Sequence, residues 1–410
     1  MANSYNQEVS VATGLTGTSG QSRLVGTVSG AAPTTGTFAV GDFVVDQTGA
    51  IYVCTVAGTP GTWVLTKASN ITGTVAIANG GTGATNAVAS LINLGALAST
   101  QYVAGKNFII NGGMDIWQRG TTGFTTNSAY TADRWGAGLN SGTFAVSQST
   151  DVPTGFTYSL SLVGTTALNA QIFTRIESAN STPFAGKTVT LSLWAKSTAG
   201  TSQLGYSNGY ANSVNNFASQ TGDTNGTFTS GAPSGSWTKY SATFTANALA
   251  ANGYQIIIYR AGTDTSTTLI TGVQLEIGST ATTFSRAGGT IQGELAACQR
   301  YLPAVTLSSG NSTVVGMANL TTRSYYWLNF GTTSRVAPTG ITISALSGFN
   351  VFNGSVSNGT PTAVTYDSGS LYGSLIYVDT TAGSPTIATG QATLFRVTST
   401  GSILFTGCEL

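Results

Sequence analysis

Charged residues are scarce in this 410-residue chain. Only 7% of its residues are Asp, Glu, Lys or Arg, whereas typical globular proteins have about 25%. The formal net charge is +1 and the basic residues do not cluster, which excludes a nucleic acid held through its phosphates as the main partner. A hydrophobic fraction of 41% can still build a core, so the low charge does not indicate disorder.

Histidine is absent, and cysteine is rare. Without histidine the chain lacks the commonest general base, the Ser-His-Asp arrangement and most metal-ligand patterns. The three cysteines, Cys54, Cys298 and Cys408, lie far apart without a CxxC pair, which excludes a disulfide framework and a zinc site. We expect Cys298 to be a small apolar core residue, and we expect no cofactor and no catalytic residues.

Long apolar runs are missing as well. No stretch of 18 apolar residues occurs, and the first residues (MANSYNQEVS) show neither a basic segment nor an apolar one. We therefore expect no signal peptide and a soluble chain made in a cytoplasm. The 53 glycines follow no Gly-X-Y period, which excludes collagen.

In place of charged residues, the chain is rich in Thr, Ser, Asn and Gly. This composition favours many short strands joined by tight turns. A polar, uncharged surface suits neutral hydroxylated ligands such as glycans, but burial between subunits accounts for low charge equally well.

The first 105 residues divide into two parts. Residues 1–68 are predicted to be a small β-rich module, with strands at 38–46 and 51–56. Residues 69–105 are predicted to be a Gly-rich linker with one short helix at 86–94, whose apolar stripe consists of Val88, Leu91 and Ile92. Such a short helix is marginal alone, so we expect it to pack against copies of itself. No lysine lies between Lys67 and Lys106, so the glycines of this linker do not form a P-loop.

The rest of the chain is predicted to be mainly β. Residues 106–289 should form a β-sandwich, because strand-like runs recur at 142–148, 158–163, 170–176, 188–196, 238–245, 254–259 and 272–277. Residues 290–303 should form a connecting helix that Thr290 caps and Pro303 ends, with one apolar face made by Ile291, Leu295, Cys298 and Leu302. Residues 304–410 return to short strands, which predicts a C-terminal β domain.

Six segments resemble the tail fibres of tailed bacteriophages. Residues 77–85 (IANGGTGAT) with 93–95 (NLG) are similar to a linker that recurs in those fibres. Residues 106–120 (KNFIINGGMDIWQRG) and 131–135 (TADRW) resemble the opening of a fibre domain, and 272–278 (GVQLEIG) with 294–302 (ELAACQRYL) resemble its close.

The resemblance covers residues 70–302 and implies a fold, an assembly and a role. It implies a homotrimer, a jelly roll similar to carbohydrate-binding modules, an N-terminal attachment to other tail or baseplate proteins, and a C-terminal tip. It also implies that the chain is part of the virion and that its partner is host cell-surface polysaccharide. Trimer contacts are expected from the 86–94 helix and from the 291–302 helix.

Aromatic residues are the candidate glycan-binding groups, because flat rings cover the apolar face of a sugar. Trp194 should share a strand face with Thr190, Ser192 and Lys196. The other candidates are Tyr206, Asn208, Tyr210 and Asn212 in a turn-rich stretch, and Tyr325, Tyr326 and Trp327 near the C-terminus. Each could instead pack in the core or between subunits.

Other aromatic and acidic residues allow further interpretations. Trp117, Trp135 and Trp237 are expected to be structural, the first two beside charges that form a buried network or a stack of arginine on indole. A polysaccharide depolymerase would need two facing carboxylates, such as Asp115 with Asp133 or Glu177 with Glu276. No β-helix repeat supports that alternative. A purely structural fibre or baseplate connector also remains open, whereas the lack of a signal peptide disfavours a module of a secreted enzyme.

Overall fold

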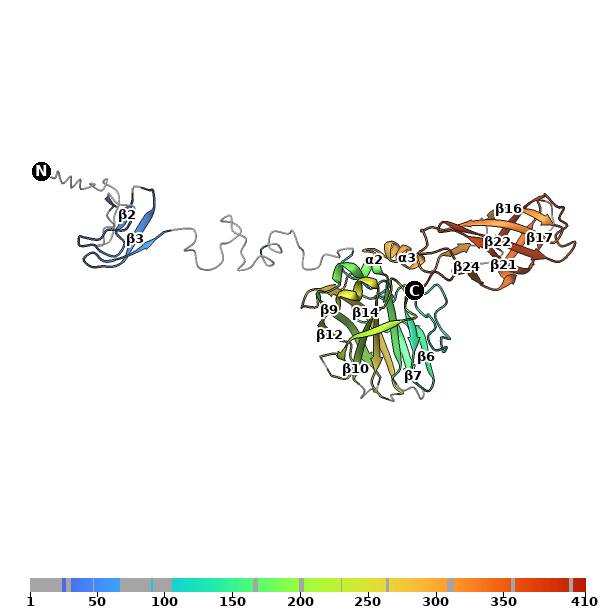
Figure 1. The fold of residues 1–410 in the computed structure, drawn as a ribbon, viewed down its shortest axis with the longest axis horizontal. Helices are drawn as coiled ribbons and strands as arrows, with labels where there is room; N and C mark the ends of the chain where they lie inside the picture. Colours follow the sequence, from blue (N-terminus) through green and yellow to red (C-terminus); the bar gives the residue numbers. More distant parts are fainter. Residues whose placement is uncertain are drawn as a thin grey trace. The chain divides into compact units, whose positions relative to one another are not determined.

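The computed structural model describes residues 24–26, 31–46, 48–66, 90, 105–164, 169–198, 203–229, 231–262, 265–307, 313–354, 358–397 and 401–410. The chain divides into two compact units, Met1–Gln101 and Tyr102–Leu410. Both are built mainly from antiparallel strands (Figure 1). The expected mainly β fold class is therefore confirmed. The helix predicted at 86–94 lies outside the described residues except for Ser90, and so do its stripe residues Val88, Leu91 and Ile92.

The first unit contains one four-stranded sheet. Its strands β1 (Leu24–Gly26), β2 (Phe43–Val45), β3 (Ile51–Val56) and β4 (Thr62–Leu65) lie in chain order. The two predicted strands are present, and the turn between them is held by Asp46, whose carboxylate accepts hydrogen bonds from the backbone N–H groups of Thr48 and Ala50.

The second unit begins with a sandwich of two five-stranded sheets. The sheet that we call the β10 sheet has the order β11 (Gln220–Thr227), β10 (Leu204–Ala211), β13 (Tyr254–Arg260), β8 (Gln171–Ile176) and β5 (Gly136–Gly138). The β9 sheet has the order β12 (Thr238–Thr245), β9 (Thr188–Ser197), β14 (Thr267–Ile277), β7 (Ser159–Gly164) and β6 (Phe144–Ser149). The helices α2 (Ser178–Ser181), η3 (Thr182–Phe184) and η4 (Ala248–Asn252) complete the sandwich, and Figure 1 shows α2 at one end of the sheets.

Alternation of apolar and polar residues builds the sandwich core. On β9, Val189, Leu191, Leu193 and Ala195 point inward and are fully buried, as their spacing predicts. They belong to one apolar cluster with Ile172, Ile256 and Ile258 of the opposite sheet. All seven strands predicted between 142 and 277 are found, whereas β5, β10 and β11 were not predicted.

The predicted connecting helix is present as α3 (Ile291–Gln299). The Thr290 hydroxyl accepts a hydrogen bond from the Gly293 N–H at 3.0 Å, which confirms the predicted N-cap. The predicted trimer contact of this helix needs a correction, because Cys298 and Leu302 are buried within their own chain. Those two side chains stabilise the fold of one subunit, while Ile291 is exposed and Leu295 is half-buried.

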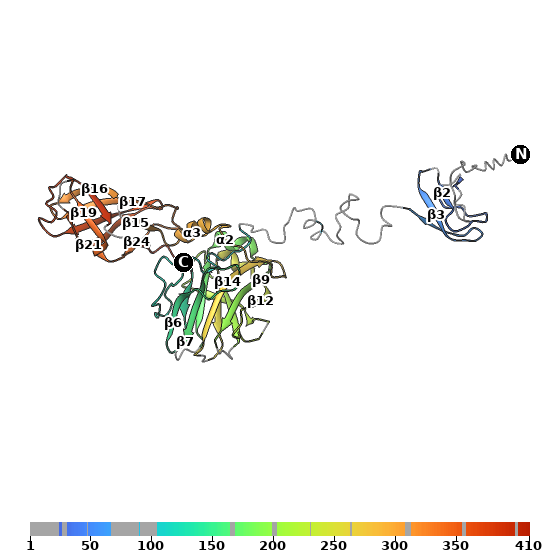
Figure 2. The ribbon, with the colours of Figure 1, turned by 180° about the vertical axis from the view of Figure 1, so that it is seen from behind.

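A second, smaller sandwich follows. Its seven-stranded sheet has the order β20 (Asn358–Gly359), β19 (Phe349–Phe352), β23 (Ala392–Val397), β16 (Thr313–Leu320), β17 (Arg323–Asn329), β22 (Gly373–Thr380) and β21 (Pro361–Gly369). Its three-stranded sheet has the order β15 (Ala304–Leu307), β24 (Gly401–Thr406) and β18 (Gly340–Ile343), and η5 (Leu346–Gly348) precedes β19. Figure 2 shows the strands of this sandwich from behind. Both sheets contribute to one apolar core, which includes Tyr326, Phe395 and Phe405.

Candidate functional site

The outer face of the β10 sheet gathers aromatic and amide side chains. The inward residues of its strands, such as Ile172, Ile256 and Ile258, are buried in the core. Side chains alternate along a strand and directly paired residues share a face. The outward set is therefore Gly136 and Gly138 on β5, Gln171, Phe173 and Arg175 on β8, Gln255, Ile257 and Tyr259 on β13, and Gly205, Ser207 and Gly209 on β10.

Two aromatic rings lie across this face above glycines. A Cβ atom added to Gly205 would be 2.3 Å from Cζ of Tyr259, and one added to Gly136 would be 2.2 Å from Cζ of Phe173. Each ring therefore occupies the space in which the neighbouring strand would otherwise carry a side chain. As a result, the rings lie along the sheet, and Tyr259 is half-buried.

Amides and hydroxyls surround the rings. Gln171 pairs with Tyr259 across the sheet, and Ser207 pairs with Ile257. Gln255 is held by Arg175, whose Nε donates a hydrogen bond to its amide oxygen at 2.9 Å. The edge strand β11 adds the exposed Asn225 and Thr227. A flat ring with hydrogen-bonding groups beside it is the arrangement that recognises the apolar face and the hydroxyls of a sugar.

Leu410 covers one end of this face. The guanidinium of Arg175 lies 5.2 Å from the ring centroids of Phe173 and Phe217, and its Nη1 donates to the Leu410 carbonyl at 2.6 Å. The Tyr130 hydroxyl donates to the same oxygen at 3.0 Å. Burial raises the pKa of Tyr130, so its phenol stays protonated and remains a donor. Phe173 is buried under these groups, which leaves Tyr259 as the accessible ring.

Two of the predicted glycan-binding residues point the other way. Residues 205–212 are not a loop but lie mostly within β10, where Tyr206 pairs with Ile258 and Asn208 with Ile256. Tyr206 and Asn208 therefore face the core and are buried, out of reach of an external ligand. Tyr210 is half-buried against the same core, and the exposed Asn212 bonds to Ser219 and Thr221 at the start of β11.

Trp194 lies on the outer face of the other sheet, where it is half-buried opposite Lys239. The polar neighbours expected beside it are not all available, because Thr190 and Ser192 are buried. A Cβ atom added to Gly272 would be 3.0 Å from Cδ1 of Trp194, so the indole lies close to β14. Trp194 stays a predicted candidate, separate from the face of the β10 sheet.

The three C-terminal candidates have different surroundings. Tyr326 is in the core of the second sandwich, where its hydroxyl bonds to Thr393 at 2.9 Å, so its prediction as a binding residue is wrong. Trp327 is exposed and its indole lies above Gly373, as Tyr259 lies above Gly205. Tyr325 is half-exposed and faces Tyr377 across the strands.

The charges of the TADRW motif form a buried network. Arg134 stacks on the ring of Tyr301 at 3.6 Å from its centroid and forms an ion pair with Glu409, which also pairs with Arg119 at 3.0 Å. Burial alone would lower the pKa of Arg134, but the Glu409 carboxylate together with Tyr130, Tyr301 and Cys298 outweighs burial, so the pKa is raised and the cation persists. A buried network of charges was expected here, but Glu409 was not expected in it, and the stacking partner is the phenol ring of Tyr301 in the turn after α3 and not an indole.

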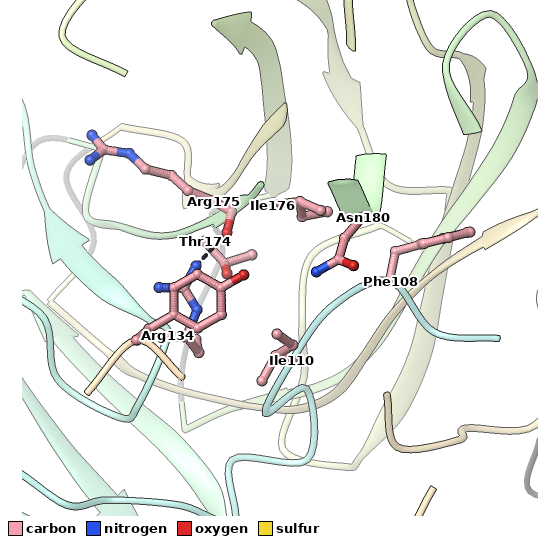
Figure 3. A pocket seen from close by; sticks show the side chains of 8 residues that line it. Phe108, Ile110, Arg134, Thr174, Arg175, Ile176 and Asn180 are labelled. Atoms are coloured by element: carbon pink, nitrogen blue, oxygen red, sulfur yellow. Dashed lines mark hydrogen bonds between the residues drawn. The ribbon is translucent and has the colours of Figure 1, made fainter. Parts of the chain in front are cut away.

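A narrow crevice lies beside this network. Figure 3 shows Arg134 donating to the backbone carbonyl of Arg175 beside Thr174, with Phe108, Ile110, Ile176 and Asn180 around them. Tyr301 also lines the crevice. The two terminal nitrogens of Arg134 bond to Glu409 and to the Arg175 carbonyl, so the crevice is part of the packing among the opening motif, β8, α2 and the turn after α3. Trp135 is likewise structural, because its buried indole donates to the Asn111 carbonyl at 3.0 Å.

The four carboxylates considered as catalytic pairs are bonded to neighbouring cations or backbone N–H groups. Asp115 pairs with Arg286 at 2.9 Å, Glu177 pairs with Arg300 at 3.0 Å, and Glu276 accepts from the Thr282 N–H at 2.8 Å. Asp133 accepts from the Gln118 N–H at 2.9 Å, and burial raises its pKa. Among the described residues, no three His, Cys, Asp or Glu side chains lie together as a metal site requires.

Comparisons with known proteins complete the description. No family description and no curated protein matches the sequence. Solved structures that match include a putative sugar binding protein from Bacteroides thetaiotaomicron, with 14% identity and a TM-score of 0.30 over 42% of this chain and 100% of that chain. A xylan-binding domain, CBM22-1, from Paenibacillus barcinonensis Xyn10C has 13% identity and a TM-score of 0.29 over 43% and 98% of the chains.

A phage protein also matches. The enzymatically active domain of tailspike protein 4 from bacteriophage CBA120 has 16% identity and a TM-score of 0.30, over 44% of this chain and 24% of that chain. Within the described residues, the helices of this chain include none that is both long enough and apolar enough to span a bilayer.

Proposed function

We propose that this chain is a subunit of a homotrimeric phage tail fibre that binds host cell-surface polysaccharide without cleaving it. The outer face of the β10 sheet is the binding surface, and Tyr259 is its platform. The observation that carries the proposal is the ring of Tyr259 lying above Gly205, with Gln171 as its cross-strand partner and Ser207 two residues further along β10.

The chemistry of this face suits a neutral saccharide. A sugar stacked on Tyr259 loses water from its apolar face, while its hydroxyls meet amide and hydroxyl groups that can both donate and accept. The only charged side chain in the outward set, Arg175, is already bonded to Gln255 and to the Leu410 carbonyl. The surface therefore does not favour a charged ligand.

The fibre context is supported by the six sequence segments that resemble tail fibres. In that context, the chain is assembled in the host cytoplasm and incorporated into the virion, with its first unit bound to other tail or baseplate proteins. A site of one accessible ring binds weakly, on the order of millimolar, and three copies per fibre raise the effective affinity without further contacts.

Absence of cleavage is part of the proposal. The sequence has no histidine, and the four carboxylates considered above each hold a cation or a backbone donor. A general acid for glycoside hydrolysis needs a proton that it can deliver to the bond being broken, which these bonded groups do not offer to an external ligand.

A glycan array of bacterial surface polysaccharides tests the proposal. The full chain should capture at least one polysaccharide, Tyr259→Ala should lose most of that signal, and the captured polymer should keep its length after incubation. No capture by the parent chain would indicate a structural connector instead. New reducing ends would indicate a depolymerase.

A further inference from the structure

Two tryptophans and two lysines share the outer face of the β9 sheet. Trp194 on β9 is the direct cross-strand partner of Lys239 on β12. The same register, continued by two positions, brings Lys196 opposite Trp237, the residue directly before β12. Directly paired residues share a face and side chains alternate along a strand, so all four point away from the core. Each of them is half-buried and keeps part of its surface in solvent.

Gly272 of β14 makes room for the rings of this cluster. Its φ is +63°, and a bulge shifts the pairing of β14 with β9 beside it. A Cβ atom added to Gly272 would be 2.6 Å from Cζ of Phe156 and 3.0 Å from Cδ1 of Trp194. Both rings therefore approach a position that has no side chain, as the ring of Tyr259 does above Gly205.

Asp151 neutralises the charge of Lys196 at one end of the cluster. Its carboxylate forms an ion pair with the Lys196 ammonium group at 2.6 Å and accepts a hydrogen bond from the Trp237 indole at 2.9 Å. These bonds fix Trp237 and Lys196 beside each other. Asp151 and Lys196 together add no net charge to the face.

In the described part of this cluster, Lys239 is the cation that pairs with no carboxylate. Its ammonium group donates to a neutral group, the Thr282 carbonyl. Glu276 and Lys106, the charged groups that act on it, form an ion pair with each other at 3.7 Å. Burial lowers the pKa of Lys239, Glu276 raises this pKa and Lys106 lowers it. A carboxylate supplied by a ligand would therefore stabilise the charged form of Lys239.

We propose that this cluster binds a carboxylated sugar, which stacks on Trp194 and directs its carboxylate at Lys239. The apolar face of a pyranose suits an indole, and a carboxylate satisfies a partly buried ammonium group. The Cβ atoms of directly paired residues are about 5 Å apart, so one sugar can contact both side chains. A nucleic acid fits less well, because it needs several clustered cations. The face belongs to the sheet opposite Tyr259, so the inference goes beyond the proposed neutral-saccharide site and does not rest on it.

Oligomers of galacturonate, glucuronate and mannuronate, each compared with its methyl ester, separate charge from stacking. Acid and ester present the same sugar rings, but only the acid carries carboxylates. In calorimetric titrations at low salt, the full chain should bind at least one acid about tenfold more tightly than its ester. This preference should shrink as salt is added, because partly exposed charges are screened. Equal affinity for acid and ester in all three pairs would overturn the inference.

Lys239→Gln removes the cation and leaves the rings in place. It should weaken binding of the preferred acid about tenfold and abolish the preference over the ester. The matched control is Lys187→Gln, which removes an exposed lysine at the other end of β9. Unchanged binding by Lys239→Gln, or an equal loss in Lys187→Gln, would show that the cation beside Trp194 does not recognise the carboxylate.

Trp194→Phe tests the stacking, because it keeps a flat ring of smaller area. It should weaken acid and ester alike, by less than about tenfold, with a melting temperature close to that of the parent chain. Unchanged affinity for both forms would exclude the indole as the platform. Displacement of the acid by an equal concentration of inorganic phosphate would reveal a plain anion site and would also overturn the inference.

The two sites of the sandwich can be tested separately. Tyr259→Ala should leave the affinity for the acid unchanged, and Lys239→Gln should leave capture of neutral polysaccharide unchanged. If the array shows no neutral capture but the acid still binds through Lys239, the proposed function at Tyr259 fails and this inference stands. Loss of acid binding in Tyr259→Ala would assign both ligands to one site and would overturn it.

Discussion

A methyl group at Gly205 should displace the ring of Tyr259. The added Cβ would lie 2.3 Å from Cζ, 2.6 Å from the hydroxyl oxygen and 2.7 Å from Cε2 of that ring, whereas ordinary contacts begin at 3.4 Å. The ring must move by at least about 1 Å, because the methyl group is fixed to the strand while the half-buried side chain can turn. Gly205→Ala therefore removes the platform without removing any group of the face.

The size of the effect follows from the area that the ring offers. Full burial of a large apolar side chain is worth about 1.5–3 kcal/mol. A sugar covers one face of the ring, so its contribution is roughly half, about 1–1.5 kcal/mol, or close to tenfold in the dissociation constant. Gly205→Ala should weaken binding by up to about tenfold, and Tyr259→Ala sets the upper limit for that loss.

Calorimetric titration with the polysaccharide captured on the array measures this change. The control is Gly222→Ala on the neighbouring strand β11, where an added Cβ meets nothing within 4 Å. Both variants should melt within about 3 °C of the parent chain, since neither glycine has the positive φ that would strain alanine. If Gly205→Ala binds as well as Gly222→Ala, the ring of Tyr259 is not the platform and the proposed site is wrong.

Three further predictions concern stability. Arg134→Met should lower the free energy of unfolding by about 1.5–3 kcal/mol in a denaturant titration, because it removes the closest cation of the Glu409 carboxylate, which keeps Arg119. Thr290→Ala should cost about 1 kcal/mol, read as a melting temperature lower by about 2–4 °C, with Thr290→Ser as the control that keeps the cap. Hydrogen bonds from Lys196 and Trp237 lower the pKa of Asp151, so its stabilisation is present above about pH 4 and is lost as the pH falls through the lowered pKa. Because solvent screens this carboxylate, Asp151→Asn should lower stability by at most about 1 kcal/mol at pH 7 and by nothing near pH 2.

The elements that could be predicted are those in which apolar residues alternate clearly. β9 shows this pattern in its letters, and α3 shows apolar residues at helical spacing with a threonine at its start. β10 (LGYSNGYA) does not, because its outward positions are Gly205, Ser207 and Gly209. Two glycines and a serine suggest a turn, so Tyr206 was placed in a loop when it belongs to the core.

The same three outward residues explain why the candidate site could not be read from the sequence. Gly205 is small because the ring of Tyr259, a residue 54 positions later on another strand, occupies its place. A glycine in a strand indicates a bulge or the close approach of another group, but the approaching group is known only once β10 and β13 are paired. A strand that contains Gly or Ser at every second position should therefore be compared with the aromatic residues of the remaining strands before it is assigned as a loop. In this chain that comparison leads from Gly205 to Tyr259 and from Gly136 to Phe173, and it identifies the face that the choice of Tyr206 and Asn208 missed.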